Sequence, residues 1–384
     1  MRSTAVWCYR PRMIPPHAKP LIELDEAWRT SCAGERLALV RRGAAALRER
    51  VLQSGRVVSV RTFDVSPLPY PTDFGFGGAA TSPVPYLMMT NRATLVQFET
   101  DGGDLKTLLF NPTDAKRSAE TPYFVELRRK MGEFLSRRVE AAVTRPRPHE
   151  QLPSVGLAPE DVDYVAFDHL HTQDLRGTLG TKEGGATSAY FPRAKLLVWR
   201  PELEIFRELH PLQRYWYLAD GIRGVPDDRF LVCGGDVLLG RGVALIRTPG
   251  HTIGNWSLVI NTDSGIWAIS ENGIACDSYA PEASRIPGLS KWARRFGAEV
   301  ILNSNTLELR NDQYTSMVLE KALVDRCADA PEFYQHFSSS ELTPSPLTPG
   351  LAPTYRHKAI VSGEVRRPRI TRAEASQPAR PTAH

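Results

Sequence analysis

Three histidines in two short segments carry the strongest chemical signal in this chain of 384 residues. His169 and His171 follow an apolar run at residues 162–167, and His251 lies about eighty residues later in the segment Thr248-Pro249-Gly250-His251-Thr252. Three neutral imidazoles are one of the ligand sets that hold catalytic zinc while leaving a coordination position open for water. We therefore expect the three histidines to form a metal centre.

The sequence around these histidines resembles the metallo-β-lactamase superfold. Residues 163–171 resemble its first metal loop, usually written H-x-H-x-D-H, and residues 248–254 (T-P-G-H-T-I-G) resemble its third-histidine loop. Residues 191–198 (F-P-R-A-K-L-L-V) resemble a strand between the two, and residues 93–98 and 105–110 resemble the opening hairpin. The resemblance covers roughly residues 56–323. It implies an α/β fold, an αβ/βα sandwich of two mixed sheets with outer helices and the metal loops at one edge.

The chain departs from the family pattern at the ligands of the second metal. Gln173 stands where the family has aspartate, and Asp174 stands where it has histidine. Glu271 aligns with the metal-bridging aspartate, and Asn303 or Asn305 aligns with the last histidine. A neutral amide is a poor ligand for zinc or iron, whereas a carboxylate is a good one. The resemblance thus implies one metal rather than two, most simply zinc, with iron as the other option.

Two carboxylates are the candidates for acid–base chemistry at this centre. Glu271 keeps the charge of the aspartate it replaces and could close the metal site or act as the base. Asp174 could reach the metal or its bound water, although an aspartate directly after a strand is also a common helix N-cap. For Asn303 and Asn305, the simpler interpretation is that of loop residues with turn-forming side chains.

The resemblance implies a metal-dependent hydrolase of a small-molecule substrate. A metal-bound hydroxide would attack an ester, lactone, thioester or amide carbonyl, and Glu271 or Asp174 would orient the water or accept its proton. The metal or a backbone amide of residues 177–185 would stabilise the oxyanion. Two alternatives remain open. One is a mononuclear iron oxygenase that uses His169 or His171 with His251 and Glu271, and the other is a non-catalytic binding protein on the same scaffold.

Composition favours a cytoplasmic enzyme over a membrane or secreted protein. The chain is 42% hydrophobic and 24% charged, which is ordinary for a globular protein. It contains no apolar run near the roughly 20 residues that span a bilayer, and its first residues lack an apolar signal core. The five cysteines are dispersed, which favours reduced thiols over a disulfide framework.

The net charge of +5 resides in the C-terminal segment. Residues 355–384 contain seven basic and two acidic side chains, and seven minus two equals the whole excess. The remainder of the chain is neutral overall, so a nucleic-acid-binding surface is not expected.

Composition also divides the chain into three parts. Residues 1–55 form an expected N-terminal helical extension, residues 56–335 the metallo-β-lactamase-like domain, and residues 336–384 a Pro/Ser/Arg-rich tail with little fixed structure. Residues 21–53 should form one or two helices, because Leu37, Val40, Ala44, Leu47 and Val51 recur at steps of three and four and so share one helical face. Composition predicts further helices at 121–143, 202–218 and 312–328. The stretch 66–86 is dense in proline, glycine and aromatic residues, and we expect it to border the substrate groove.

Overall fold

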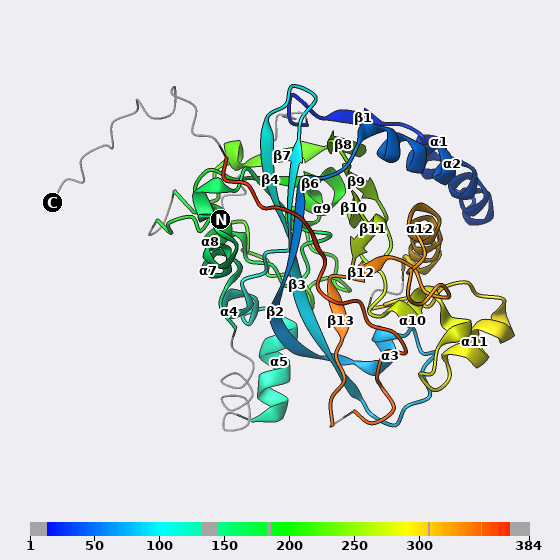
Figure 1. Cartoon of the computed structure of the whole chain (residues 1–384). Helices are drawn as coiled ribbons and strands as arrows, with labels where there is room; N and C mark the ends of the chain where they lie inside the picture. Colours follow the sequence, from blue (N-terminus) through cyan, green and yellow to red (C-terminus); the bar gives the residue numbers. More distant parts are fainter. Residues whose placement is uncertain (1–13, 133–144, 183–185, 306–307, 347, 369–384) are drawn as a thin grey trace, which may run out of the picture.

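Two mixed β-sheets lie face to face, with helices on their outer sides (Figure 1). The computed structural model describes residues 14–132, 145–182, 186–305, 308–346 and 348–368. The first sheet runs in the order β1 (Lys19–Leu21), β8 (Asp236–Gly240), β9 (Val243–Arg247), β10 (Trp256–Thr262), β11 (Gly265–Ser270) and β12 (His336–Ser338). The second runs in the order β14 (Val361–Gly363), β2 (Ser59–Pro71), β3 (Tyr86–Glu99), β4 (Leu105–Phe110), β5 (Tyr164–Ala166), β6 (Lys195–Trp199) and β7 (Phe230–Cys233), and β13 (Ser340–Leu342) pairs with β3.

The pairing within each sheet brings the ends of several strands to one edge of the sandwich. β4, β5, β6 and β7 run parallel to one another, whereas β2, β3 and β4 alternate in direction. In the first sheet, β8, β9, β10 and β11 are antiparallel, and β12 runs parallel to β11. The predicted α/β sandwich of two mixed sheets is confirmed. The predicted hairpin at 93–98 and 105–110 corresponds to β3 and β4.

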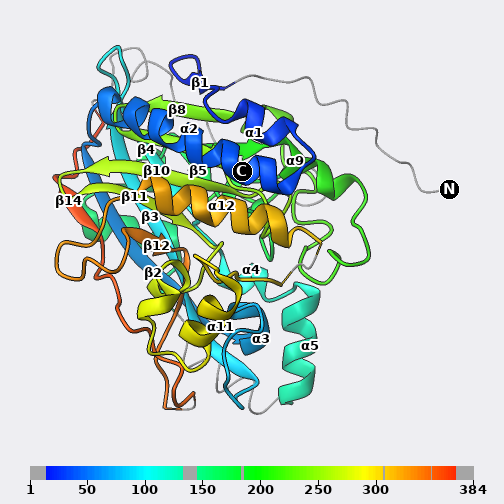
Figure 2. The ribbon, with the colours of Figure 1, turned by 90° about the vertical axis from the view of Figure 1, so that its right-hand side faces the viewer.

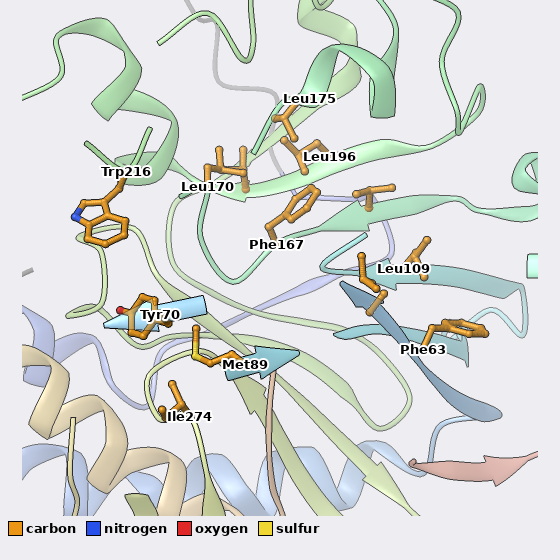
Figure 3. Packing of buried hydrophobic residues seen from close by; sticks show 14 of the residues in the cluster. Phe63, Tyr70, Met89, Leu109, Phe167, Leu170, Leu175, Leu196, Trp216 and Ile274 are labelled. Carbon is orange, nitrogen blue, oxygen red and sulfur yellow. The ribbon is translucent and has the colours of Figure 1, made fainter. Parts of the chain in front are cut away.

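One hydrophobic core lies between the two sheets. Val96 and Phe98 of β3 and Leu108 of β4 are buried in one cluster with Leu245 of β9 and Leu258 of β10. Successive side chains of a strand point to opposite faces, so residues of β3 and β4 that alternate with these face the outer side of the second sheet. Figure 3 shows that outer cluster, in which Leu170 of the histidine loop lies near Leu196 and Leu175, while Leu109 and Phe63 lie farther along the sheet.

The helices cover the outer faces of the sheets. They are α1 (Asp25–Arg29), α2 (Ala33–Ser54), α3 (Thr72–Gly75), α4 (Ala115–Ser118), α5 (Pro122–Met131), α7 (Pro148–Gln151), α8 (Leu175–Leu179), α9 (Arg200–Glu204), α10 (Cys276–Tyr279), α11 (Leu289–Phe296) and α12 (Arg310–Leu323). Figure 2 shows α2 and α12 side by side across the first sheet. Val40, Ala44, Leu47 and Val51 are buried, so the apolar face predicted for α2 packs on the body of the protein.

Two predicted helices are shorter than expected. Within residues 202–218, α9 ends at Glu204, a single 3₁₀ turn follows at Ile205–Arg207, and turns continue to Leu218. These turns hold Trp216 against the histidine loop, where the Thr172 amide donates to the Trp216 carbonyl at 2.7 Å. Within 121–143, α5 ends at Met131, and residues 133–144 lie outside the described part.

The predicted C-terminal tail requires a correction. We expected residues 336–384 to have little fixed structure, yet β12, β13 and β14 extend both sheets. The physical reason is the burial of four apolar residues against the sandwich: Phe337, Leu342, Leu351 and Ile360. Composition did not predict this burial, because Ser, Thr and Pro dominate the surrounding sequence. Residues 369–384 lie outside the described part. At the other end of the chain, β1 pairs with β8, so residues 19–21 are part of the first sheet.

Among the residues that the structure describes, no helix has both the length and the apolar character required to cross a membrane.

Candidate metal centre

The three predicted histidines meet at one edge of the sandwich. His169 and His171 lie in the turn between β5 and α8, and His251 lies in the turn between β9 and β10. All three are buried, and one ring nitrogen from each lies within 4.8 Å of the others. One cation could therefore contact all three, so the structure brings together the residues predicted to share a site.

Hydrogen bonds to the opposite ring nitrogen orient two of these histidines. Nδ1 of His169 lies 2.7 Å from the Asp168 carboxylate. Nδ1 of His251 lies 3.2 Å from the Asn303 carbonyl oxygen. Metal-binding histidines almost always donate their second N–H to such an oxygen, because this fixes the tautomer and leaves Nε2 for the metal.

In His171, the nitrogen that faces an oxygen acceptor is Nε2 instead of Nδ1. Its Nε2 lies 3.2 Å from Oε1 of Gln213, and its Nδ1 lies 3.4 Å from Nδ2 of Asn305. If Nε2–H donates to Gln213, Nδ1 carries the lone pair of the neutral ring. A donor set of three imidazole nitrogens within 4.8 Å of one another fits a transition metal.

Burial favours the neutral form of two of the three rings. Desolvation and the neighbouring His169 lower the pKa of His251 to about 3, and they also lower the pKa of His171 well below its usual range. Burial opposes the charged form of His169 as well, but the Asp168 carboxylate outweighs it and raises the pKa of His169 to about 9. Because neutral imidazole is the form that binds a metal, only His169 has to release a proton to become a ligand.

Two glycines let the His251 turn approach its neighbours closely. Gly250 has φ 144°, and a Cβ there would lie 2.1 Å from the Cα of Gln313 in α12. A Cβ on Gly254 would lie 2.2 Å from Cβ of Glu202 in α9. Any larger residue would push the turn away, which explains physically why glycine occupies both positions of the T-P-G-H-T-I-G segment.

Glu202 joins the two histidine turns. Its buried carboxylate accepts hydrogen bonds from the backbone amide of Leu170 and from the hydroxyls of Tyr217 and Thr252, each at 2.7 Å. Leu170 lies between the first two histidines, and Thr252 directly follows His251. The carboxylate therefore fixes the spacing of the two turns. Nothing in the local sequence around Glu202 indicates these distant partners, so its role could not be predicted.

Glu271 lies beside the histidines, as expected from its position in the family pattern. One carboxylate oxygen is 4.0 Å from Nε2 of His251, and the other accepts a hydrogen bond of 2.6 Å from the Ser340 hydroxyl. Burial raises the pKa of Glu271 to about 7, although His169 acts in the opposite direction. Glu271 also forms a second cluster of possible ligand atoms with Asp168 and His169. Its role as a ligand or base stays a prediction.

Asp174 lies outside both clusters of possible ligands. Its carboxylate caps α8 by accepting from the Arg176 amide at 3.0 Å, and it forms ion pairs with Arg176 and Arg117. The helix-cap interpretation thus describes its observed contacts. Gln173 lines the pocket and donates to the Thr113 hydroxyl at 3.1 Å.

Asn303 and Asn305 are not simple turn residues. The side chain of Asn303 donates to the Glu271 carbonyl at 2.9 Å and accepts from the Tyr70 hydroxyl at 2.8 Å. Both asparagines are buried, and Asn305 contacts His171. Residues 300–305 do form a loop, as expected, but the loop is largely buried, and the two side chains contact Tyr70, the Glu271 carbonyl and His171 instead of closing a turn. The amides replace the expected ligand and support the site instead.

Asp168 and the segment that follows β12 complete the surroundings of His169. The second oxygen of the Asp168 carboxylate accepts from the Asn111 amide at 3.0 Å and from the Ser339 hydroxyl. Ser339 lies where the chain crosses from β12 in the first sheet to β13 in the second. The role of Asp168 could have been predicted from its position directly before the H-x-H motif. The role of Ser339 could not, because it belongs to the segment that composition assigned to the tail.

A pocket opens over the histidines. Its apolar wall includes Leu68, Met89, Tyr123, Phe124 and Trp216. Tyr123 and Trp216 have ring centroids 4.9 Å apart, and Trp216 and Tyr70, which lie near one another in Figure 3, have centroids 6.3 Å apart. Leu68 and Tyr70 belong to the proline- and aromatic-rich stretch 66–86, so the prediction that this stretch borders the groove is confirmed.

The predicted oxyanion loop lies elsewhere. Among the described residues of 177–185, the amides of Gly180, Thr181 and Lys182 donate to the carbonyls of Arg176, Thr187 and Gly224 respectively. These amides already donate hydrogen bonds within the fold, and none of these three residues lines the pocket. Residues 183–185 lie outside the described part.

Relatives of known activity match a short part of the chain. No protein-family model matches the sequence. Over 112 residues, the chain is 33% identical to an N-acyl homoserine lactonase from a Bacillus species and 32% identical to one from Bacillus cereus. The alignment spans 29% of this chain and 38% of the length of each relative. The chain therefore matches well under half of these lactonases.

Solved structures are similar to this chain over a longer stretch. A probable metal-dependent hydrolase from Staphylococcus aureus is 14% identical, with a TM-score of 0.47 over 69% of this chain and 83% of that one. A variant of the AiiA protein of B. thuringiensis with N-decanoyl-L-homoserine bound at its active site is 20% identical, with a TM-score of 0.42 over 63% and 88%. AidC, a dizinc quorum-quenching lactonase, is 12% identical, with a TM-score of 0.45 over 81% and 98%.

The two mixed sheets and the histidine turns at their shared edge decide the assignment. The chain has a metallo-β-lactamase-like fold. The resemblance inferred from residues 163–171 and 248–254 is therefore confirmed.

Proposed function

We propose that this protein is a metal-dependent hydrolase that cleaves an ester or lactone of a small molecule. The observation that carries the proposal is the convergence of ring nitrogens from His169, His171 and His251 within 4.8 Å, at the base of a pocket. The 112-residue similarity to N-acyl homoserine lactonases supports the same chemistry.

The three histidines would hold one metal ion, with zinc as the first candidate. A bound zinc ion lowers the pKa of a coordinated water toward about 7 and polarises a carbonyl. The overall reaction adds water to the carbonyl carbon and breaks the C–O bond, which yields a carboxylate, a hydroxyl group and one proton.

Glu271 is the residue we assign to proton transfer. It lies 4.0 Å from His251, and a carboxylate whose pKa is raised to about 7 is suited to accept and release a proton near neutral pH. The Ser340 hydroxyl holds one of its oxygens at 2.6 Å and thereby directs the other toward the histidines. Asp174 has no such role, because its carboxylate is engaged by Arg117 and Arg176.

Elemental analysis and a lactone hydrolysis assay test this proposal together. Protein purified without chelator should contain one equivalent of zinc and should hydrolyse a short neutral lactone. His171→Ala and His251→Ala should lose both the metal and the activity. Protein that contains one equivalent of iron and consumes dioxygen would instead support the oxygenase alternative. Protein without metal after such a purification would support the binding-protein alternative.

A further inference from the structure

A second cavity joins the pocket over the histidines. It has a volume of about 400 Å³, which lies within the range of cavities that bind small molecules. Leu68, Asn91, Thr113, Phe124 and Thr172 line both spaces. The two therefore form one continuous groove that leads away from the metal centre.

The wall of the second cavity is apolar. It is built by the β2 segment at residues 66–69, by α4 and by α5, and it includes Pro67, Ala119, Leu127 and Met131. Figure 1 shows α4, α5 and α7 beside β2, on the other side of the molecule from α2 and α12. An extended hydrocarbon chain fits such a surface, because burial of apolar groups against it is favourable at about 25 cal/mol per Å².

The part of the groove beyond the shared residues is positively charged. Four basic side chains line it against one acidic side chain, Glu150, which is a formal excess of three. The basic residues are Lys116, Arg128, Arg145 and Arg147. None of these four lines the pocket over the histidines. The basic residue that does line that pocket, Arg92, is buried and pairs with Glu341 at 3.1 Å.

Two of these cations already have carboxylate partners. Arg147 pairs with Glu150 at 2.7 Å, and Arg128 pairs with Glu120 at 3.5 Å. Lys116 lies on α4 and Arg145 precedes α7, and both are exposed. These two side chains are therefore accessible to a ligand that enters the groove.

We propose that the substrate is an elongated acyl compound with an anionic group at the end opposite to the scissile carbonyl. The carbonyl would lie over the histidines, the hydrocarbon chain along α5, and the distal anion near Lys116 and Arg145. This proposal deepens the hydrolase assignment and rests on it for the position of the carbonyl. It commits to an anionic chain end, because a carboxylate there could pair with Lys116 and Arg145, whereas a neutral chain end would form an ion pair with neither.

Equilibrium binding tests the proposal without requiring turnover. We would titrate the metal-loaded protein with decanoate and with decanedioate, which share one carboxylate and chain length and differ only in the second carboxylate. Calorimetry should show that decanedioate binds at least tenfold more tightly. In the double variant Lys116→Ala/Arg145→Ala, the affinity for decanedioate should fall to that for decanoate, and the affinity for decanoate should stay unchanged.

Two further variants define the control and the location. Arg29→Ala removes a cation on α1, outside the residues that line the groove, and should leave the tenfold preference intact. Leu127→Trp should weaken both ligands because the larger ring fills the groove. Equal affinities of the two ligands in the unaltered protein would overturn the proposal, and so would a preference that persists in the double variant.

The outcome is separable from that of the hydrolase proposal. A short neutral lactone does not reach Lys116 or Arg145, so its hydrolysis tests the metal centre alone. Hydrolysis without a preference for decanedioate would refute the groove assignment and leave the hydrolase intact. A preference without hydrolysis would refute the hydrolase and leave an anion-terminated ligand.

Discussion

Glu202→Gln provides a strict test of how the metal site is held together. The substitution keeps the size of the side chain but removes its charge. Glu202 accepts three hydrogen bonds, from the Leu170 amide and from the Tyr217 and Thr252 hydroxyls. A hydrogen bond to a charged group contributes about 1.5–3 kcal/mol and a neutral one about 0.5–1.5. The three bonds together should lose about 3 kcal/mol.

The loss should reach the metal as well as the fold. Two of the three donors lie in the separate turns that carry His171 and His251, so a weaker Glu202 lets the turns move apart. Substitutions that disturb the support of metal ligands typically lower metal affinity about 10- to 100-fold. We therefore expect Glu202→Gln to lower both the free energy of unfolding and the affinity for zinc.

Asp277→Asn is the matched control. Asp277 is also a buried carboxylate with three donors, the Ser284 hydroxyl and the amide and hydroxyl of Thr354, but it contacts neither histidine turn. Urea unfolding of metal-free protein measures stability, and competition with a chromophoric chelator measures zinc affinity. Asp277→Asn should lower stability alone. If Glu202→Gln lowers stability but binds zinc as tightly as the unaltered protein, the carboxylate supports the fold and does not set the ligand geometry.

Four further predictions concern single residues. Glu271→Gln should lower hydrolytic turnover about a hundredfold or more with its zinc content retained, and unchanged turnover would remove it as the base. Asn303→Ala should keep the metal but lose about 1–3 kcal/mol of stability, because the Tyr70 hydroxyl and the Glu271 carbonyl lose their hydrogen-bond partner. A loss of metal as complete as that of His251→Ala would contradict this expectation. Asp174→Ala should cost about 1 kcal/mol from the lost helix cap without a change in zinc content by elemental analysis. Burial lowers the pKa of His357 to about 4. The stability that neutral His357 contributes is therefore present above about pH 6.5 and is lost as the pH falls toward 4. In urea titrations at pH 6.5 and pH 5, His357→Gln should lose about 1.5 kcal/mol less free energy of unfolding between the two pH values than the unaltered protein does, and an equal loss would contradict the lowered pKa.

Local sequence was sufficient to predict the histidine turns. The H-x-H motif and the T-P-G-H-T-I-G motif each encode one turn, because the ligands and the glycines that permit close packing are adjacent in the chain. The apolar spacing of Val40, Ala44, Leu47 and Val51 likewise encodes one face of α2. These features depend on neighbours a few residues apart, which a single sequence displays.

The support of the site could not be predicted in the same way. Ser339 is 171 positions away from its partner Asp168, and Glu202 is 50 positions away from its partner Thr252. Such contacts depend on the packing of the two sheets and leave no local pattern. The error over residues 336–368 has the same origin, because the short strands β12 and β13 contain polar residues that are buried only through the sheets they join.

The observed contacts of the residues at the family's second-metal positions favour one metal. Asp174 is bound by two arginines, Gln173 donates to Thr113, and Asn305 contacts His171. A second cation would have to use Asp168 and Glu271, the carboxylates closest to His169. Asp168 already accepts hydrogen bonds at both oxygens, from the His169 ring at one and from Asn111 and Ser339 at the other, so a metal bond at either oxygen would compete with them. These contacts of Gln173, Asp174 and Asn305 agree with the proposal that the three histidines, with Glu271 beside them, hold a single metal ion.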